Sequence, residues 1–281
     1  GNDAFYSCDS LSEVIIGEGV KDLHAGVFLR CDELRSLIIP ESVEMIPPDF
    51  CNGCKKLEKI VLPSKTKEIC GCAFDDCISL KEFRIPNMVE SIGSHAFCRC
   101  TNLSTINIPS SVKDMALNAF RDCPDLEVNF DQDTRFEKCG DFPYTYKDKP
   151  FRKLLHRTKL SLIESTSLKR IAAIEFIRSS ADYPDDLKTE YIEFCKKNRG
   201  RIINDAYTVY KDETVNNEII RFYQEIGLST KNKKLNEHEK VLLLEKMADE
   251  GTFEDFKTVF DKYKTFEFYP RALEKDRKSV V

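Results

Sequence analysis

The chain has 281 residues, 12 of them cysteines, and a formal net charge of −5. Residues 1–130 carry 13 basic and 20 acidic side chains and residues 131–281 carry 30 and 28, so neither half has the basic excess of a nucleic-acid-binding protein. No apolar run approaches the ~18 residues that a membrane-spanning helix needs. We therefore expect no nucleic-acid partner and no membrane span, in a chain long enough for two domains.

The first 126 residues repeat with a strict period of 23. The recurring residues are Cys8, Cys31, Cys54, Cys77, Cys100 and Cys123, with Leu11, Leu34, Leu57, Leu80, Leu103 and Leu126. Apolar residues three and five positions after each leucine alternate as in a short strand with one buried face, and a proline follows in most units. One such unit cannot bury its apolar side alone. The period therefore predicts a solenoid of stacked units that share a parallel sheet.

The repeating cysteines are predicted to be interior residues, because a free thiol packs like a small buried hydrophobe. Some cysteine pairs also have spacings seen in metal or redox sites, namely Cys51/Cys54, Cys70/Cys72 and Cys98/Cys100. One alternative is a metal held by Cys70, Cys72 and His95 on adjacent coils. Structural zinc requires four ligands, and core positions occupy part of these pairs, so we expect no metal and no cofactor.

Residues His95–Pro109 read HAFCRCTNLSTINIP, which matches the order AF-x-x-C-x-x-L-x-x-I-x-IP. This pattern resembles the BspA-type leucine-rich repeat of bacterial surface proteins, and the resemblance covers about residues 4–130. It implies a non-enzymatic binding or adhesion module that is secreted or lies at the cell surface. The many probable free thiols indicate a cytoplasmic location instead. Both locations remain open at this stage, and the sequence does not predict the oligomeric state.

From about Phe151 the apolar period changes to that of helices. Helices are expected after Ser167 and from Pro184, Thr214, Asn236 and Thr252. Gly200 is expected to break the helix that begins at Pro184. The sequence thus predicts a two-domain protein with α and β structure: a leucine-rich repeat solenoid in residues 1–130 and an all-α helical-hairpin domain in 131–281 that caps it. Residues 235–263 are weakly similar to an ankyrin-type helical pair, although the TPLH signature is absent. Aromatic residues from Phe130 to Tyr146 are expected to cover the end of the solenoid.

The outward face of the predicted sheet is the candidate binding surface. It carries residues two and four positions after each leucine, and the candidates are Ile15, Ile38, Val61, Arg84, Asn107, Lys59 and Glu82. The first three form an exposed aliphatic row, which often marks an interaction site. Two alternatives are that β-branched residues only stabilise a narrow sheet, and that upstream sequence covers the row.

The expected function is non-enzymatic binding of a protein or a glycan. An alternative is an intracellular scaffold or regulatory protein that recognises its partner through the helical half. The chain has no phosphate-binding glycine loop and no metalloprotease motif. An enzyme would need a site formed by Cys139, His156 and a carboxylate, and no spacing supports it, so we expect no catalytic residue.

Overall fold

The computed structural model describes residues 1–140, 149–206 and 213–226. The chain divides into two compact units: Gly1–Ala172 with Ala181–Glu190, and Ala173–Ser180 with the residues from Tyr191 on. The predicted helices from Asn236 and Thr252, the ankyrin-like pair and the aromatic residues Phe142, Tyr144 and Tyr146 lie outside the described residues.

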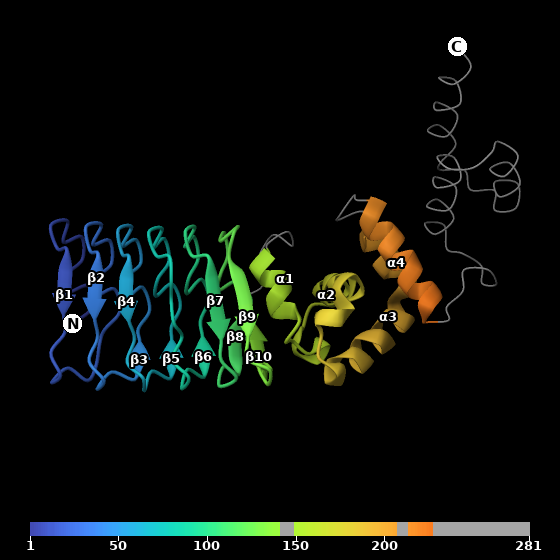
Figure 1. Cartoon of the computed structure of the whole chain (residues 1–281), viewed down its shortest axis with the longest axis horizontal. Helices are drawn as coiled ribbons and strands as arrows, with labels where there is room; N and C mark the ends of the chain where they lie inside the picture. Colours follow the sequence, from blue (N-terminus) through green and yellow to red (C-terminus); the bar gives the residue numbers. More distant parts are fainter. Residues whose placement is uncertain (141–148, 207–212, 227–281) are drawn as a thin grey trace, which may run out of the picture. The chain divides into compact units, whose positions relative to one another are not determined.

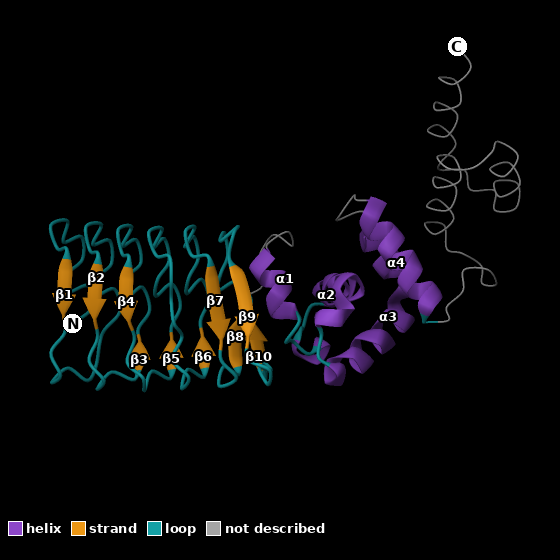
Figure 2. Ribbon diagram, viewed as in Figure 1, coloured by secondary structure: helices purple, strands orange, loops and turns teal. Residues whose placement is uncertain are grey.

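The first unit contains the predicted solenoid, with short strands that all pair in parallel (Figures 1 and 2). One sheet has the order β1 (Glu13–Ile15), β2 (Ser36–Ile38) and β4 (Lys59–Val61). A second has the order β10 (Lys138–Gly140), β8 (Asp114–Ala116), β6 (Ser91–Ile92), β5 (Glu68–Ile69) and β3 (Met45–Ile46). A third pairs β7 (Thr105–Ile108) with β9 (Glu127–Phe130). These parallel sheets confirm the predicted fold.

Each coil turns at two corners where the backbone has a positive φ. The first corner falls at Asp3, Gly26, Asp49, Cys72 and His95, and the second at Ser7, Arg30, Gly53, Asp76, Arg99 and Asp122. Aspartate and histidine are among the residues that adopt this left-handed region most readily. Cys72 adopts it as well, at φ 56°, although cysteine has no such preference. The recurrence of both corners explains why the period stays at 23.

Two adjacent coils approach closely at Gly93. A Cβ added there would lie 2.6 Å from the backbone nitrogen of Gly71 on the preceding coil. Gly17, by contrast, would place a Cβ in open space. The glycine at position 93 is therefore required by the approach of two backbones, not by its own dihedral angles.

A column of phenylalanine rings fills the core, one ring per coil. Phe28, Phe50, Phe74, Phe97 and Phe120 are all at most 1% exposed. The third coil departs from the sequence pattern, because Cys51 occupies the usual aromatic position. Phe50 supplies the ring from one residue earlier and lies 5.5 Å from the ring of Phe28 and 6.4 Å from that of Phe74. The other coils have a small residue at this earlier position, so the exchange conserves core volume.

The repeating cysteines from Cys31 onward are buried, as predicted, and they also form hydrogen bonds. The thiol of Cys54 donates to the carbonyl of Phe28 at 3.0 Å, and Cys100 donates to Phe74 at 3.1 Å. Cys31, Cys77 and Cys123 make the equivalent bond, each to the residue 26 positions earlier. Burial raises the pKa of Cys31 to about 11, so its thiol keeps the proton that it donates. We call Cys31, Cys54, Cys77, Cys100 and Cys123 the cysteine rungs.

The coil pattern continues past residue 130, beyond the point at which the sequence motif is lost. The last strand pair slips by one residue, so that Val128 pairs with Ile106 and its side chain remains buried. Strand β10 then pairs with β8, which places Cys139 beside Met115 in the inward row of the second sheet. Cys139 is thus a half-buried packing residue of the sixth coil.

A short helical segment packs against the last coil. Helix α1 (Lys149–Leu155) contacts β9, and a 3-10 turn follows at Leu160–Leu162. The guanidinium of Arg157 lies 4.8 Å from the centre of the Phe130 ring. The backbone carbonyl of Arg157 accepts a hydrogen bond from the backbone N–H of Phe136, whose side chain is fully buried. The guanidinium of Arg157 thus covers the aromatic ring of Phe130 beside the last coil. The described part of the predicted aromatic junction is therefore present.

The remaining helices are α2 (Thr166–Ser179), a 3-10 turn at Ser180–Asp182, α3 (Asp185–Asp205) and α4 (Glu213–Glu225). Helices α2, α3 and α4 begin within two residues of the predicted starts. The break expected at Gly200 lies two residues earlier, because α3 is interrupted by a kink at Asn198, where φ is −110° and ψ is 16°. The side chain of Asn198 donates to the carbonyl of Phe194, and this local bond accompanies the kink. No described helix is long and apolar enough to cross a membrane.

Candidate functional site

The predicted aliphatic row lies on the first sheet, with its side chains in direct register. Ile15 pairs with Ile38, and Ile38 pairs with Val61. Their exposed fractions are 79%, 53% and 55%. We call Ile15, Ile38 and Val61 the stripe. Three large aliphatic side chains on adjacent strands therefore face solvent together.

Strand alternation determines which residues point outward. In β2 the middle residue, Leu37, is buried, and in β4 the middle residue, Ile60, is also buried, so the residues on either side face away from the core. The outward set includes Lys59, which lies on β4 two residues before Val61 and is exposed. Glu13 holds the equivalent place on β1 and is also exposed. The stripe therefore has charged neighbours on the same face.

The polar candidates lie on the coils that follow the stripe. Glu82 and Arg84 are exposed, and Glu82 forms an isolated parallel bridge with Thr105. Within the described ranges, no ladder joins β4 to this coil. Asn107, on β7, donates from its side chain to Asp131 at 2.9 Å, so it is already engaged within the last two coils. The seven predicted residues thus share an outward face, but Asn107 belongs to a separate strand pair.

Lys59 and Arg84 are among the basic residues of the described solenoid that form no ion pair, whereas Arg35 and Lys67 are paired. Arg35 pairs with Glu58 at 3.2 Å, and Lys67 pairs with Glu44 at 2.7 Å. For Lys59 and Arg84, no ion pair or hydrogen bond of the side chain is present in the part of the chain that the structure describes. The cations beside the stripe are therefore available to an external carboxylate.

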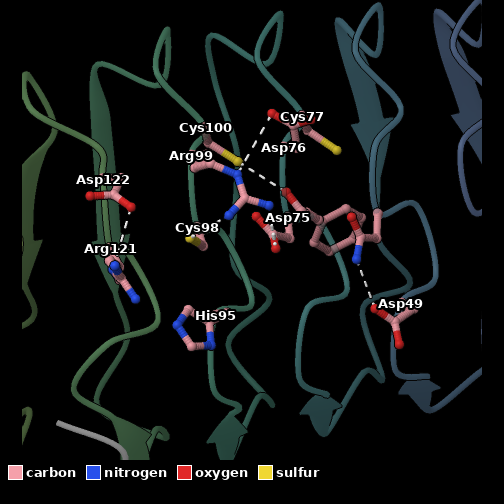
Figure 3. Close-up of polar contacts among 12 residues, drawn as sticks. Asp49, Asp75, Asp76, Cys77, His95, Cys98, Arg99, Cys100, Arg121 and Asp122 are labelled. Atoms are coloured by element: carbon pink, nitrogen blue, oxygen red, sulfur yellow. Dashed lines mark hydrogen bonds and ion pairs between the residues drawn. The ribbon is translucent and has the colours of Figure 1, made fainter. Parts of the chain in front are cut away.

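A second group of ionisable residues lies at the coil corners (Figure 3). The sequence pattern did not reveal it as a cluster. Arg99 donates to the carboxylate of Asp75 at 2.9 Å and lies 3.8 Å from that of Asp76. The thiol of Cys98 is 3.7 Å from the same guanidinium. Asp75 is 7% exposed, and burial raises its pKa although Arg99 acts in the opposite direction.

The corner cluster is a buried carboxyl group paired with a guanidinium. Burial raises the pKa of Cys98 to about 12, so its thiol is protonated near neutrality and is a poor nucleophile. One oxygen of Asp75 bonds to Arg99, and the other is buried without a hydrogen bond. The cluster was missed because Asp75 and Arg99 are 24 residues apart. Aligning the repeats would have found them, since they occupy neighbouring corner positions on successive coils.

The metal and enzyme alternatives both depend on cysteine and histidine side chains. Among the residues that the structure describes, no group of three or more His, Cys, Asp or Glu side chains could hold a metal ion. His156 is 5% exposed, and burial lowers its pKa to about 4, while its ring lies 4.7 Å from that of Tyr183. Cys139 is on β10, where burial raises its pKa to about 12.

An alternating row of charges runs along the second sheet and was also missed. It consists of Lys21, Glu44, Lys67, Glu90, Lys113 and Glu137, one per coil. The backbone amides of Lys67 and Glu90 each donate to the preceding member of the row, which fixes their register. The hydrogen bond to Glu44 raises the pKa of Lys67. The side chain of Lys67 forms an ion pair with Glu44 at 2.7 Å.

Comparison with known families identifies the repeat region. A sequence model described as BspA type Leucine rich repeat region matches residues 1–127 in six copies. Residues 1–127 are thus similar to this family in sequence. The match ends near Val128, where the one-residue slip in register occurs. The comparison with curated proteins gave no match.

Several solved structures are similar to the chain, and those named here are bacterial leucine-rich repeat proteins. A leucine rich repeat protein of T. pallidum is 32% identical, over 42% of this chain and 58% of its own, with a TM-score of 0.41. One from Bacteroides ovatus is 28% identical, over 52% and 43%, with a TM-score of 0.41. A leucine rich cell surface protein of Faecalibacterium prausnitzii is 28% identical, over 46% and 35%, with a TM-score of 0.40. The chain thus spans between 35% and 58% of the length of these proteins.

Proposed function

We propose that the chain is a non-enzymatic interaction module whose first sheet presents the stripe to a protein or glycan partner. The observation that carries this proposal is the exposure of Ile15, Ile38 and Val61 in one register. Leaving such a row in water forgoes about 25 cal/mol for each Å² of apolar surface that a partner could bury. Repeat proteins of this type are typically binding modules, which supports the same conclusion.

The structure also argues against a purely structural reason for the stripe. If the sheet needed a β-branched residue at the outward position, the four-residue strand β7 would need it most. That strand instead has Asn107 there and still pairs over its full length with β9. Ladder formation therefore tolerates a polar residue at this position, and the aliphatic choice in β1, β2 and β4 requires another explanation.

We propose that the module acts at a bacterial cell surface or after secretion, which its family supports. The second candidate is an intracellular scaffold that binds through the helical unit, and one observation favours it: all twelve cysteines are free. Titrating thiols in protein isolated from its own cells without reductant separates the two. Twelve thiols favour a reducing compartment, and several disulfides favour export.

Site-specific photo-crosslinking tests the interaction role. A photoreactive amino acid is placed at Ile38 in the full chain and, as a matched control, at Met88, which is 49% exposed and lies off the stripe. Both variants are presented to intact cells and glycans from the native environment. Products that form from position 38 and not from position 88 support the proposal. Equal labelling from both positions, or none from either, contradicts it.

A further inference from the structure

The stripe is polarised by charge. Glu13 lies beside Ile15 at one end of the face, and Lys59 lies beside Val61 at the other. Arg84 adds a second positive charge on the following coil, where the exposed Glu82 offsets one of the two, so this end carries a net charge of +1 and the end at Glu13 carries −1. A partner that buries the stripe and complements these charges must carry its carboxylates at the end over Lys59 and Arg84.

The spacing of the stripe distinguishes between partner shapes. Neighbouring strands are ~4.8 Å apart, so Ile15 and Val61 are about 9.6 Å apart along the row. Residues i and i+7 of an α-helix rise by about 10.5 Å, and residue i+3 or i+4 falls between them on the same face. Same-face residues of an extended peptide would cover about 13 Å in two steps. The helix therefore matches the row to about 1 Å, whereas the extended chain misses it by more than 3 Å.

The chemistry of the stripe also disfavours a sugar. Ile15, Ile38 and Val61 offer no hydrogen-bonding atom in their side chains, so sugar hydroxyls held against them would lose water without gaining a partner. Aliphatic side chains of a helix lose nothing of this kind. A protein helix with an apolar row is therefore the occupant that the surface fits.

We propose that the stripe binds one amphipathic helix of a partner protein, lying across the strands, with apolar residues at i, i+3 or i+4, and i+7. Its acidic end lies over Lys59 and Arg84. This inference rests on the proposed function and specifies its partner. The helix would use apolar anchors at i, i+3 or i+4, and i+7, here against a sheet face, and a few such anchors provide most of the affinity.

Three synthetic peptides of equal length test this inference on the full chain. The first is a helical peptide with leucines at i, i+3 and i+7 and two glutamates at one end, made about 18 residues long because shorter isolated helices are marginal. The second has the same composition with the leucines at alternate positions. The third has the two glutamates replaced by lysines. Binding is measured by fluorescence anisotropy, and circular dichroism melting checks that each protein variant is folded.

Matched protein variants locate the binding. The double variant I38S/V61S removes two anchors of the stripe, and M45S/M88S removes two exposed apolar side chains elsewhere on the solenoid. We expect I38S/V61S to weaken binding of the first peptide about tenfold or more, because two aliphatic contacts are lost. The control M45S/M88S is expected to stay within about twofold of the unaltered protein.

A second pair of variants tests the charge polarity. R84E is expected to weaken the first peptide and strengthen the lysine peptide, whereas K65E makes the same charge change at an exposed site away from the stripe and is expected to do neither. A helical peptide that does not bind, or whose binding is insensitive to I38S/V61S, overturns the helix inference. So does equal or tighter binding of the alternating peptide. If crosslinking from position 38 succeeds while the helical peptide fails, the interaction role stands and only the helix is excluded.

Discussion

Replacing a cysteine rung by alanine should be far more costly in the interior of the solenoid than at its first coil. Cys100 is fully buried, and its thiol donates to the carbonyl of Phe74 at 3.1 Å. Cys8 occupies the same repeat position but is only half-buried, and its thiol forms no hydrogen bond among the described residues. C8A is therefore a control that matches C100A in residue type and in repeat position.

The magnitude follows from two contributions. Removing a buried sulfur costs about 1 kcal/mol in transfer free energy. Losing the hydrogen bond and leaving the Phe74 carbonyl without that donor costs a further 1–2 kcal/mol, roughly. We therefore expect C100A to lower the free energy of unfolding by about 2–3 kcal/mol and C8A by less than about 1 kcal/mol. Urea unfolding followed by far-ultraviolet circular dichroism measures both, since the chain has no Trp for fluorescence.

A vibrational measurement separates hydrogen bonding from packing. The S–H stretching band of the buried rungs should lie at lower frequency than that of Cys8, because donation to a carbonyl weakens the S–H bond. The difference between the S–H spectra of the unaltered protein and of C100A assigns the band that belongs to Cys100. An unshifted band for Cys100, or equal destabilisation by C100A and C8A, would refute the hydrogen-bonded rung.

Three further predictions concern backbone approach, pH and the extent of the folded unit. G93A should destabilise by more than about 2 kcal/mol because its Cβ meets the backbone of Gly71 at 2.6 Å, whereas G17A should change the melting temperature little; thermal melts compare them. The pKa of His156 is lowered from 6.5 to about 4, so the unfolded state binds the proton first. Stability from this group, worth about 3 kcal/mol, is present above pH 6.5 and lost as the pH falls towards 4. Urea midpoints across that range should show this slope, and H156F should abolish it. A fragment of residues 1–190 should melt cooperatively, and one of residues 1–130 should melt lower because it lacks β10 and α1; equal melting would favour the predicted division at residue 130.

The solenoid was predictable from the sequence because its core positions repeat in residue type. The leucines, the cysteines and the alternating apolar residues each recur at one place in the coil, so a period of 23 indicates both strands and register. The seven outward residues followed from strand alternation alone, and the structure leaves all of them exposed. Whether they form a binding surface stays a prediction.

The contacts that the sequence did not reveal depend on position between coils. The pair Asp75–Arg99 is invisible when the chain is scanned locally, because a reading over a few residues finds only Asp75 beside Asp76 and assigns a turn. The slip that places Val128 beside Ile106 was missed because one lost residue looks like the end of the motif. The kink at Asn198 was expected at Gly200, since glycine has the lower helix propensity.

The two outward rows of the solenoid differ in how their charges are satisfied, and this difference identifies the surface with capacity for a partner. In the row that contains Glu44, Lys67 and Glu90, the signs alternate from coil to coil, and Lys67 forms an ion pair with Glu44, so the row presents little net field. Exposed pairs of this kind add little stability, but they leave nothing for a ligand to complement. The stripe has the opposite character, because its apolar side chains are uncovered and Lys59 and Arg84 have no carboxylate within the described structure. A solenoid constrains its core and corner positions equally in every coil, so a functional surface can arise only where outward residues depart from the repeat, as they do between Val61 and Arg84.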